Sequence, residues 1–196
     1  MTTGTADRPL TPAARRVLEV AERLFYERGI GSVGMELIAA EAGVTKKTVY
    51  DRYGCKEALI VAYLRTRDKR WRAFVNDSLA PIADPQSRIL ATYDALGDWL
   101  RRHSPRGCSM VNALAEIPDP DHTVHAVATG QKTWLRDLYA DLAAQAGLPD
   151  PGRLADQFLL LHEGAIVTFS VANTPDAPEA ARAAAAVLLS ASTAEH

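Results

Sequence analysis

Residues 35–56 read MELIAAEAGVTKKTVYDRYGCK, and this stretch decides how the rest of the chain is interpreted. It predicts two short helices joined by a tight turn. Ala39 is small enough for another helix to pack closely, and Gly43 suits the left-handed residue that ends the first helix. Thr45 is a favourable N-cap for the second helix, and Val49 is expected to point into a core. The stretch therefore predicts a helix-turn-helix unit.

The second helix of this unit is expected to present cationic and hydroxyl side chains to solvent. Such side chains suit a recognition helix in the major groove of DNA, since lysine donates to guanine and threonine can touch a thymine methyl. The residues expected at base edges and adjacent phosphates are Thr45, Lys46, Lys47 and Thr48. The residues expected to position the helix through phosphate contacts are Tyr50, Tyr53 and Lys56.

The same pattern has plainer interpretations. The two helices could be a hairpin whose polar face is simply solvated. Tyr53 could belong to the core instead of contacting phosphate. Asp51 would be repelled by phosphate, so we expect it to face solvent rather than to accept a hydrogen bond from cytosine.

The helix-turn-helix residues also resemble the TetR family of one-component repressors, over about residues 13–60. The segments that carry the resemblance are Ile38-Ala39, Ala42-Gly43-Val44-Thr45, Thr48-Val49-Tyr50, Tyr53 and Lys56-Glu57-Ala58-Leu59. The resemblance implies an all-α homodimer with an N-terminal DNA-binding domain. It also implies a larger C-terminal helical domain for ligand binding and dimerisation.

The expected organisation is a flexible arm over residues 1–10, a three-helix helix-turn-helix domain over 11–55, and a ligand-binding and dimerisation domain over 56–196. Thr11 and Pro12 suit the N-cap and first position of the opening helix. Apolar spacing and breaks at Gly and Pro predict about nine helices. After residue 54 the expected helices cover about 55–76, 86–102, 109–116, 121–146, 153–171 and 177–192.

Composition favours a soluble cytoplasmic protein. The chain has 196 residues and a net charge of −2. Residues 1–70 hold 13 basic and 9 acidic residues (+4), and residues 71–196 hold 9 and 15 (−6), which would orient the N-terminal part toward a polyanion. We find no apolar segment typical of a signal peptide and none near the roughly 20 residues of a membrane span.

The C-terminal segment predicts self-association. Residues 180–191 read AARAAAAVLLSA, and a helix that is apolar nearly all round is usually covered on both sides. We therefore expect the last two helices to pair with those of a second copy in a four-helix contact. The alternative is that they only complete the core of one subunit.

The C-terminal helices also carry large or singly polar residues that could converge on a small-molecule pocket. The candidates are Trp71, Trp99, Cys108, Met110, Asn112, Trp134, His162 and Phe169, together with Tyr139 and Glu163. Each could equally be a core residue. Cys108 could also respond to the redox state, which the sequence leaves open.

Other site chemistry has little support. A group of acidic and histidine residues lies beside two prolines, but no second group completes a metal shell, and we expect no metal or cofactor. This group is Asp119, Asp121, His122 and His125. The common nucleotide-binding, hydrolase and zinc-protease motifs are missing from the sequence, so we expect no catalytic residues.

These observations indicate a ligand-responsive transcriptional regulator, most simply a repressor that leaves a palindromic operator when an inducer binds. The helix over residues 55–76 would connect the two domains and transmit the signal. The alternatives are a helical enzyme that uses the C-terminal pocket and a helical adaptor that binds another protein.

Overall fold

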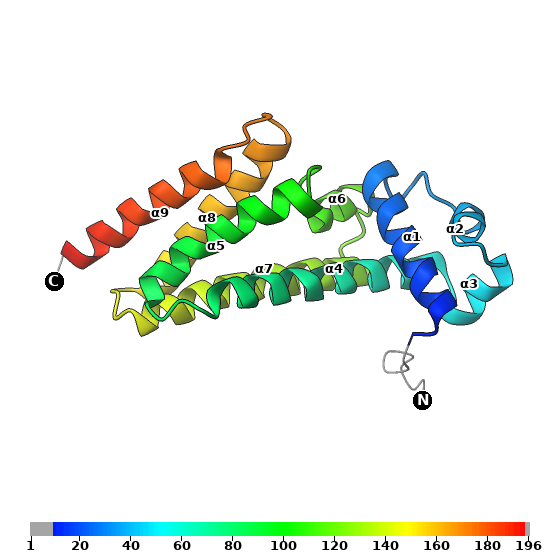
Figure 1. The fold of residues 1–196 in the computed structure, drawn as a ribbon, viewed down its shortest axis with the longest axis horizontal. Coiled ribbons are helices and arrows are strands. Elements are labelled where there is room, and N and C mark those ends of the chain that lie inside the picture. Colours follow the sequence, from blue (N-terminus) through cyan, green and yellow to red (C-terminus); the bar gives the residue numbers. More distant parts are fainter. Residues whose placement is uncertain (1–9, 195–196) are drawn as a thin grey trace.

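The computed structural model describes residues 10–194, and within that range the chain forms nine α-helices and no strand (Figure 1). The all-α expectation is confirmed. The arm expected over residues 1–10 lies outside the described residues, apart from Leu10. The helices are α1 (Pro12–Arg28), α2 (Met35–Glu41), α3 (Lys46–Tyr53), α4 (Lys56–Leu79), α5 (Pro85–His103), α6 (Ser109–Glu116), α7 (Thr123–Gln145), α8 (Pro151–Ser170) and α9 (Ala177–Ala194).

Local chemistry explains where these helices begin. The Thr11 hydroxyl accepts from the Ala14 N–H at 3.2 Å, and Pro12 takes the first position of α1. Asp150 plays the same part for α8, accepting from the Arg153 N–H at 3.2 Å. The expected start of α8 at residue 153 was therefore two residues late, because Pro151 opens the helix rather than breaking the chain.

Helices α1, α2 and α3 form an N-terminal head, and its apolar core also takes in residues of α4, α6 and α7. The buried face of α1, which includes Val17, Ala21, Leu24 and Phe25, belongs to one apolar cluster with Ile38, Val49 and Leu59. Gly43 has a φ of 64°, which is the left-handed conformation expected at the end of α2. The helix-turn-helix unit is thus built as the sequence indicates.

Helix α4 connects the head to the body formed by α5–α9 (Figure 1). Its first half contributes Leu59 and Leu64 to the head core, and its second half contributes Trp71 and Val75 to the body core. A shift of α4 in the body therefore moves apolar side chains that belong to the head.

A second connection between head and body is polar. The carboxylate of Glu116, at the end of α6, accepts from the backbone N–H groups of Ile30 and Gly31 at 2.9 and 2.6 Å. Before α6, the Arg106 guanidinium donates to the Tyr26 carbonyl at 2.6 Å. These contacts hold the C-terminal end of α1 against the loop and helix that follow α5.

Within residues 10–194, no helix combines the length and the apolar character that a membrane crossing needs.

Gly107 and Gly147 provide a matched test of packing before α6. Both have positive φ, at 80° and 68°. A Cβ at Gly107 would lie 2.7 Å from the Ser170 Oγ, whereas one at Gly147 would have no neighbour within 4 Å. We expect Gly147→Ala to cost about 1–2 kcal/mol of unfolding free energy for its backbone conformation alone. Gly107→Ala should cost about 1 kcal/mol more, measured by denaturant unfolding.

The added Ser170→Ala substitution should remove most of that excess, because it removes the atom that the new Cβ would meet. Equal costs at the two glycines would contradict the packing described before α6.

Candidate DNA interface and ligand cavity

The N-terminus of α3 is capped in the expected way. The Thr45 hydroxyl accepts from the Thr48 N–H at 3.1 Å and lies 2.9 Å from the Thr48 hydroxyl. Each lysine that follows is exposed and paired with a carboxylate: Lys46 with Glu36 of α2, and Lys47 with Asp51 at 2.7 Å. Exposed α3 thus offers hydroxyl and ammonium donors, and its lysines would share or exchange these partners when they bind another anion.

The three residues predicted to contact phosphate differ in their surroundings. Tyr50 is exposed, with the Lys46 ammonium 5.7 Å from its ring centroid. Lys56 is half-buried at the start of α4. Tyr53 is half-buried against the head core, and its hydroxyl donates to the Ala14 carbonyl at 2.8 Å. A phosphate contact from Tyr53 would therefore require its only hydroxyl proton to leave Ala14.

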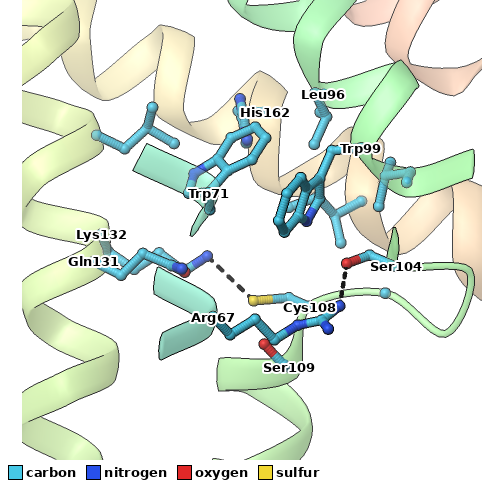
Figure 2. A pocket seen from close by; sticks show the side chains of 14 residues that line it. Arg67, Trp71, Leu96, Trp99, Ser104, Cys108, Ser109, Gln131, Lys132 and His162 are labelled. Carbon is cyan, nitrogen blue, oxygen red and sulfur yellow. Dashed lines mark hydrogen bonds between the residues drawn. The ribbon is translucent and has the colours of Figure 1, made fainter. Parts of the chain in front are cut away.

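A cavity of about 40 Å³ lies in the body between α4, α5, α7 and α8 (Figure 2). Its polar lining residues are Arg67, Ser104, Gly107, Cys108, Ser109, Gln131, Lys132 and His162. Its apolar lining residues are Trp71, Leu96, Trp99, Leu100, Leu135 and Ile166. This volume holds only a few water molecules, so a drug-sized ligand of about 300 Å³ or more requires side chains to move.

The structure brings four of the ten candidate pocket residues to this cavity: Trp71, Trp99, Cys108 and His162. The other six, Tyr139 and Glu163 included, are not among its lining residues. Met110 is fully buried in the head core, and Phe169 packs in the body core. The Asn112 side-chain amide donates to the Arg106 carbonyl at 3.1 Å. The ring of Trp134 packs against Arg72, whose guanidinium carbon lies 5.0 Å from the ring centroid. These side chains are used in packing or in a loop rather than in the cavity lining, and their role in ligand binding stays a prediction.

Sequence reasoning missed Arg67. It lies in a stretch rich in charged residues, and a charged side chain is ordinarily expected at the surface. Its side chain is only 8% exposed, and it donates to the His103 carbonyl at 2.6 Å and to the Ser104 hydroxyl. The signal was available, since Arg67 falls at helical spacing between Leu64 and Trp71, on the buried side of α4. Gln131 and Lys132 were missed because the sequence of α7 is not clearly amphipathic, so its buried side could not be identified.

His162 is a buried polar group that is satisfied inside the protein. Its Nδ1 lies 3.1 Å from the Tyr139 hydroxyl, which in turn lies 2.8 Å from the Thr92 hydroxyl. Burial, aided by the positive charge of Lys132, lowers the pKa of His162 to about 3. The imidazole is therefore neutral near pH 7 and forms part of a polar chain across the body core.

The group considered for metal binding has structural uses. His122 is the N-cap of α7 and accepts from the Val124 N–H at 3.2 Å. The His125 Nε2 lies 3.0 Å from the Ile117 carbonyl. Among the residues that the structure describes, no group of three His, Cys, Asp or Glu side chains is arranged to hold a metal ion.

Two family models match the chain in the order head, then body. The model described as "Bacterial regulatory proteins, tetR family" matches residues 17–63. The model described as "Tetracyclin repressor-like, C-terminal domain" matches residues 85–185, which is more than half of the chain. The chain belongs to the TetR family. It is a helix-turn-helix transcriptional regulator.

Similar TetR-family proteins support the same assignment. The crystal structure of SCO4454, a TetR-family transcriptional regulator from Streptomyces coelicolor, is 32% identical, with a TM-score of 0.86 over 92% of this chain and 95% of that one. A putative TetR transcriptional regulator (sav143) from Streptomyces avermitilis is 28% identical, with a TM-score of 0.72 over 85% and 90%. The HTH-type transcriptional regulator YjdC of Escherichia coli is 27% identical over 76% of this chain and 79% of its own. These matches give no support to the enzyme or adaptor alternatives.

The neutral state of His162 predicts a pH-dependent stability. Its folded pKa of about 3 lies below the ordinary 6.5, so the unfolded chain binds a proton that the folded chain excludes. This contribution to stability is fully present above pH 6.5 and is lost as the pH falls toward 3. Between pH 6.5 and pH 5 we expect it to amount to about 2 kcal/mol. Urea unfolding at several pH values measures it.

His162→Gln should flatten this part of the pH profile, whereas His103→Gln, at an exposed position, should leave it unchanged. If wild type and His162→Gln lose stability in parallel below pH 6.5, the neutral buried imidazole is not the cause.

Proposed function

We propose that this regulator represses transcription as a homodimer that binds a palindromic operator through α3 and leaves it when a small molecule occupies the body. The proposed domains are residues 11–55 for DNA binding and 56–196 for ligand binding and dimerisation. The observation that carries the proposal is an exposed helix with hydroxyl and ammonium donors, on a head joined by polar contacts to a body that contains a cavity. A regulator that acts on chromosomal DNA would work in the cytoplasm.

The proposed DNA contacts use different chemistry along α3. Thr45, Lys46, Lys47 and Thr48 supply donors and a methyl group for base edges and nearby phosphates. Tyr50 and Lys56 would position the helix on the backbone without reading sequence. Two such helices related by a twofold axis would enter successive major grooves about 34–36 Å apart. That geometry requires a dimer.

A stripe of exposed apolar and small residues on α8 supports the dimer. Leu160 and Val167 on α8 and Val171 at its C-cap are 73%, 54% and 80% exposed, and a Cβ added at Gly164 would have no neighbour within 4 Å. Their spacing of about one turn places them on one side of α8. On α9, Val187 is 68% exposed. Pairing of α8 and α9 with a second copy would cover these surfaces, in line with the prediction from the Ala-rich segment.

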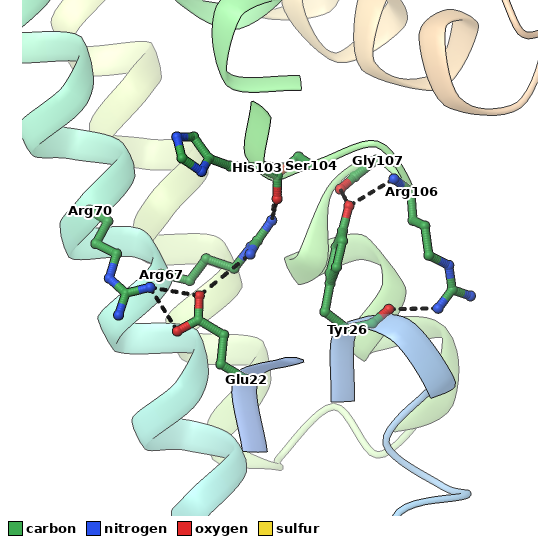
Figure 3. A network of polar contacts seen from close by, with 8 residues as sticks. All are labelled: Glu22, Tyr26, Arg67, Arg70, His103, Ser104, Arg106 and Gly107. Carbon is green, nitrogen blue, oxygen red and sulfur yellow. Dashed lines mark hydrogen bonds and ion pairs between the residues drawn. The ribbon is translucent and has the colours of Figure 1, made fainter. Parts of the chain in front are cut away.

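The path from cavity to head runs through Arg67 (Figure 3). Arg67 lines the cavity, lies 3.6 Å from the Glu22 carboxylate, and has its guanidinium carbon 4.3 Å from the centre of the Tyr26 ring. Glu22 and Tyr26 both belong to α1 of the head. A ligand that enlarges the small cavity would displace Arg67 and so change the position of α1 relative to the body. A coupling free energy of about 1–3 kcal/mol would weaken operator binding about 5–150-fold.

Charge reversal on α3 tests the DNA-binding role. Lys46→Glu with Lys47→Glu should lower affinity for a duplex selected from a random pool by about 100-fold or more, because two donors become repulsive. Fluorescence anisotropy at fixed salt measures the affinity. The matched control is Arg136→Glu with Arg153→Glu, a half-buried and an exposed arginine of the body that are also paired with carboxylates. Equal losses in both double variants would argue against α3 as the DNA-binding element.

Polar substitution on α8 tests the dimer. Leu160→Glu with Val167→Glu should convert the dimer to monomers at micromolar concentration, since two buried carboxylates without partners would oppose association. Sedimentation equilibrium gives the mass. Val111→Glu, at a 48% exposed position on α6, should remain dimeric. A wild-type protein that stays monomeric, even with DNA, would overturn the proposal.

A further inference from the structure

The charged side chains that line the body cavity are both basic. Among the residues that the structure describes, the lining contains Arg67 and Lys132 but no aspartate or glutamate, and His162 is neutral near pH 7. The acidic partners of the two cations, Glu22 and Glu163, are not lining residues. The open space of the cavity therefore faces positively charged hydrogen-bond donors, which suit an anion.

Arg67 has donor capacity that the protein does not use. Its Nη2 donates to the His103 carbonyl at 2.6 Å and to the Ser104 hydroxyl. Its Nη1 lies 3.6 Å from the Glu22 carboxylate, which is too far for a hydrogen bond, and no other described residue accepts from it. The same carboxylate receives two hydrogen bonds from Arg70, at 2.9 and 2.8 Å. Two arginines thus share one acid, and the buried guanidinium keeps N–H groups for a further acceptor.

Gln131 is a second polar group that the protein does not use. It is 8% exposed, and its side-chain amide forms no hydrogen bond with any described residue. Every fully enclosed side-chain nitrogen and oxygen in residues 10–194 has a partner, so the amide borders open space, and the cavity is the space that Gln131 lines. Figure 2 shows Gln131 extending from α7 toward the centre of the cavity. A nearly buried amide without a partner in the protein indicates a bound molecule that completes its hydrogen bonds.

Lys132, the next residue of α7, adds a charged donor. Its Nζ donates to the Glu163 carboxylate at 2.7 Å, which uses one of the donors of the ammonium group. Burial opposes the charged form, but attraction to the Cys108 sulfur and to Glu163 outweighs it and raises the pKa of Lys132 above its ordinary value. The sulfur, 3.5 Å from Nζ, is a weak acceptor, so a stronger one could replace it.

The other side of the cavity is apolar and close. The rings of Trp71 and Trp99 line a space of about 40 Å³, which fits an acid of about two to four carbon atoms without any rearrangement. A planar carboxylate matches the fork of a guanidinium, and a short alkyl chain suits the indole rings better than a fully hydrated anion does. We propose that the cavity binds a short-chain monocarboxylate through Arg67, Lys132 and Gln131. As a signal, this ligand class rests on the proposed repressor function.

The bound carboxylate would compete with Glu22 for the charge of Arg67. Glu22 would not be left without a partner, because Arg70 already donates to both of its oxygens. Arg67 also packs on Tyr26 of α1, with its guanidinium carbon 4.3 Å from the ring centre (Figure 3). Attraction of the guanidinium toward the cavity would therefore weaken two contacts between the body and α1, Glu22 and Tyr26, without requiring a large ligand.

Binding is measured by isothermal titration calorimetry of the full-length protein, with sodium propanoate as the probe. We expect a Kd below about 1 mM. Propanamide, a neutral molecule of nearly the same shape, should bind at least about tenfold more weakly, because it lacks the charge that pairs with Arg67. No propanoate binding at about 10 mM, or equal binding of propanamide, would overturn the proposal. Sulfate bound as tightly as propanoate would mean a general anion site and would also overturn it.

The unpartnered amide has a matched control on the same helix. Gln131→Leu keeps most of the side-chain volume but removes the donor, and it should weaken propanoate binding about tenfold. Gln145→Leu, at an exposed position of α7, should bind propanoate as wild type does. Circular dichroism and thermal unfolding establish that both variants are folded. If folded Gln131→Leu binds propanoate as tightly as wild type, the amide does not hold the ligand and the proposed site is wrong.

The ammonium is tested without leaving a carboxylate unpaired. Lys132→Met combined with Glu163→Gln removes both charges of the pair and should weaken propanoate binding about tenfold. Glu163→Gln alone keeps the lysine and should bind at least as tightly as wild type, because a competing anion is gone. Tighter or unchanged binding by the folded double variant would contradict a site in which Lys132 holds the carboxylate.

The regulatory step is measured separately from binding. Saturating propanoate should weaken the affinity for the selected duplex at least about fivefold, whereas propanamide at the same concentration should leave it unchanged. Propanoate that binds the protein but does not alter DNA affinity would overturn the signalling role. If the protein selects no duplex at all, the repressor proposal fails, while calorimetry still decides whether the cavity binds a carboxylate.

Discussion

The structure depends on the burial of one charge, the guanidinium of Arg67. A buried charge without partners costs several kcal/mol, so its partners must stay in place. They come from two directions: Glu22 and Tyr26 from α1 in the head, and the His103 carbonyl and Ser104 hydroxyl from the end of α5 (Figure 3). Arg67 therefore favours one arrangement of the head relative to the body. Because Arg67 also lines the cavity, a change in the shape of the cavity would alter its contacts with α1.

Much of the fold follows from local sequence. Thr11-Pro12 and Gly43 mark helix ends by their own chemistry, and the span of α6 matches the expected one, Ser109–Glu116. Helix ends were less certain where two signals compete. Pro151 reads as a break in a sequence, yet with Asp150 before it the same residue opens α8.

The site was less predictable than the fold. The exposed lysines of α3 could be predicted because Gly43 and Thr45, just before them in the sequence, fix the turn and the start of the helix. Cavity residues come from five helices and the loop before α6, and whether Trp134 or Trp71 faces the cavity depends on how those helices pack. Arg67 and Lys132 were harder still, since a charged residue is usually exposed, and only their partners Glu22 and Glu163 make burial tolerable.

The carboxylate partners of the α3 lysines bear on how this protein would move along DNA. Lys46 is paired with Glu36 and Lys47 with Asp51, so random duplex must compete with two internal anions for these cations. Non-specific sites offer phosphates but no matching bases, so contacts with them compensate little for the loss of the Lys–carboxylate pairs. The protein would dissociate quickly from such sites and move along DNA by hopping. Only a sequence that adds base contacts would give it a long residence time.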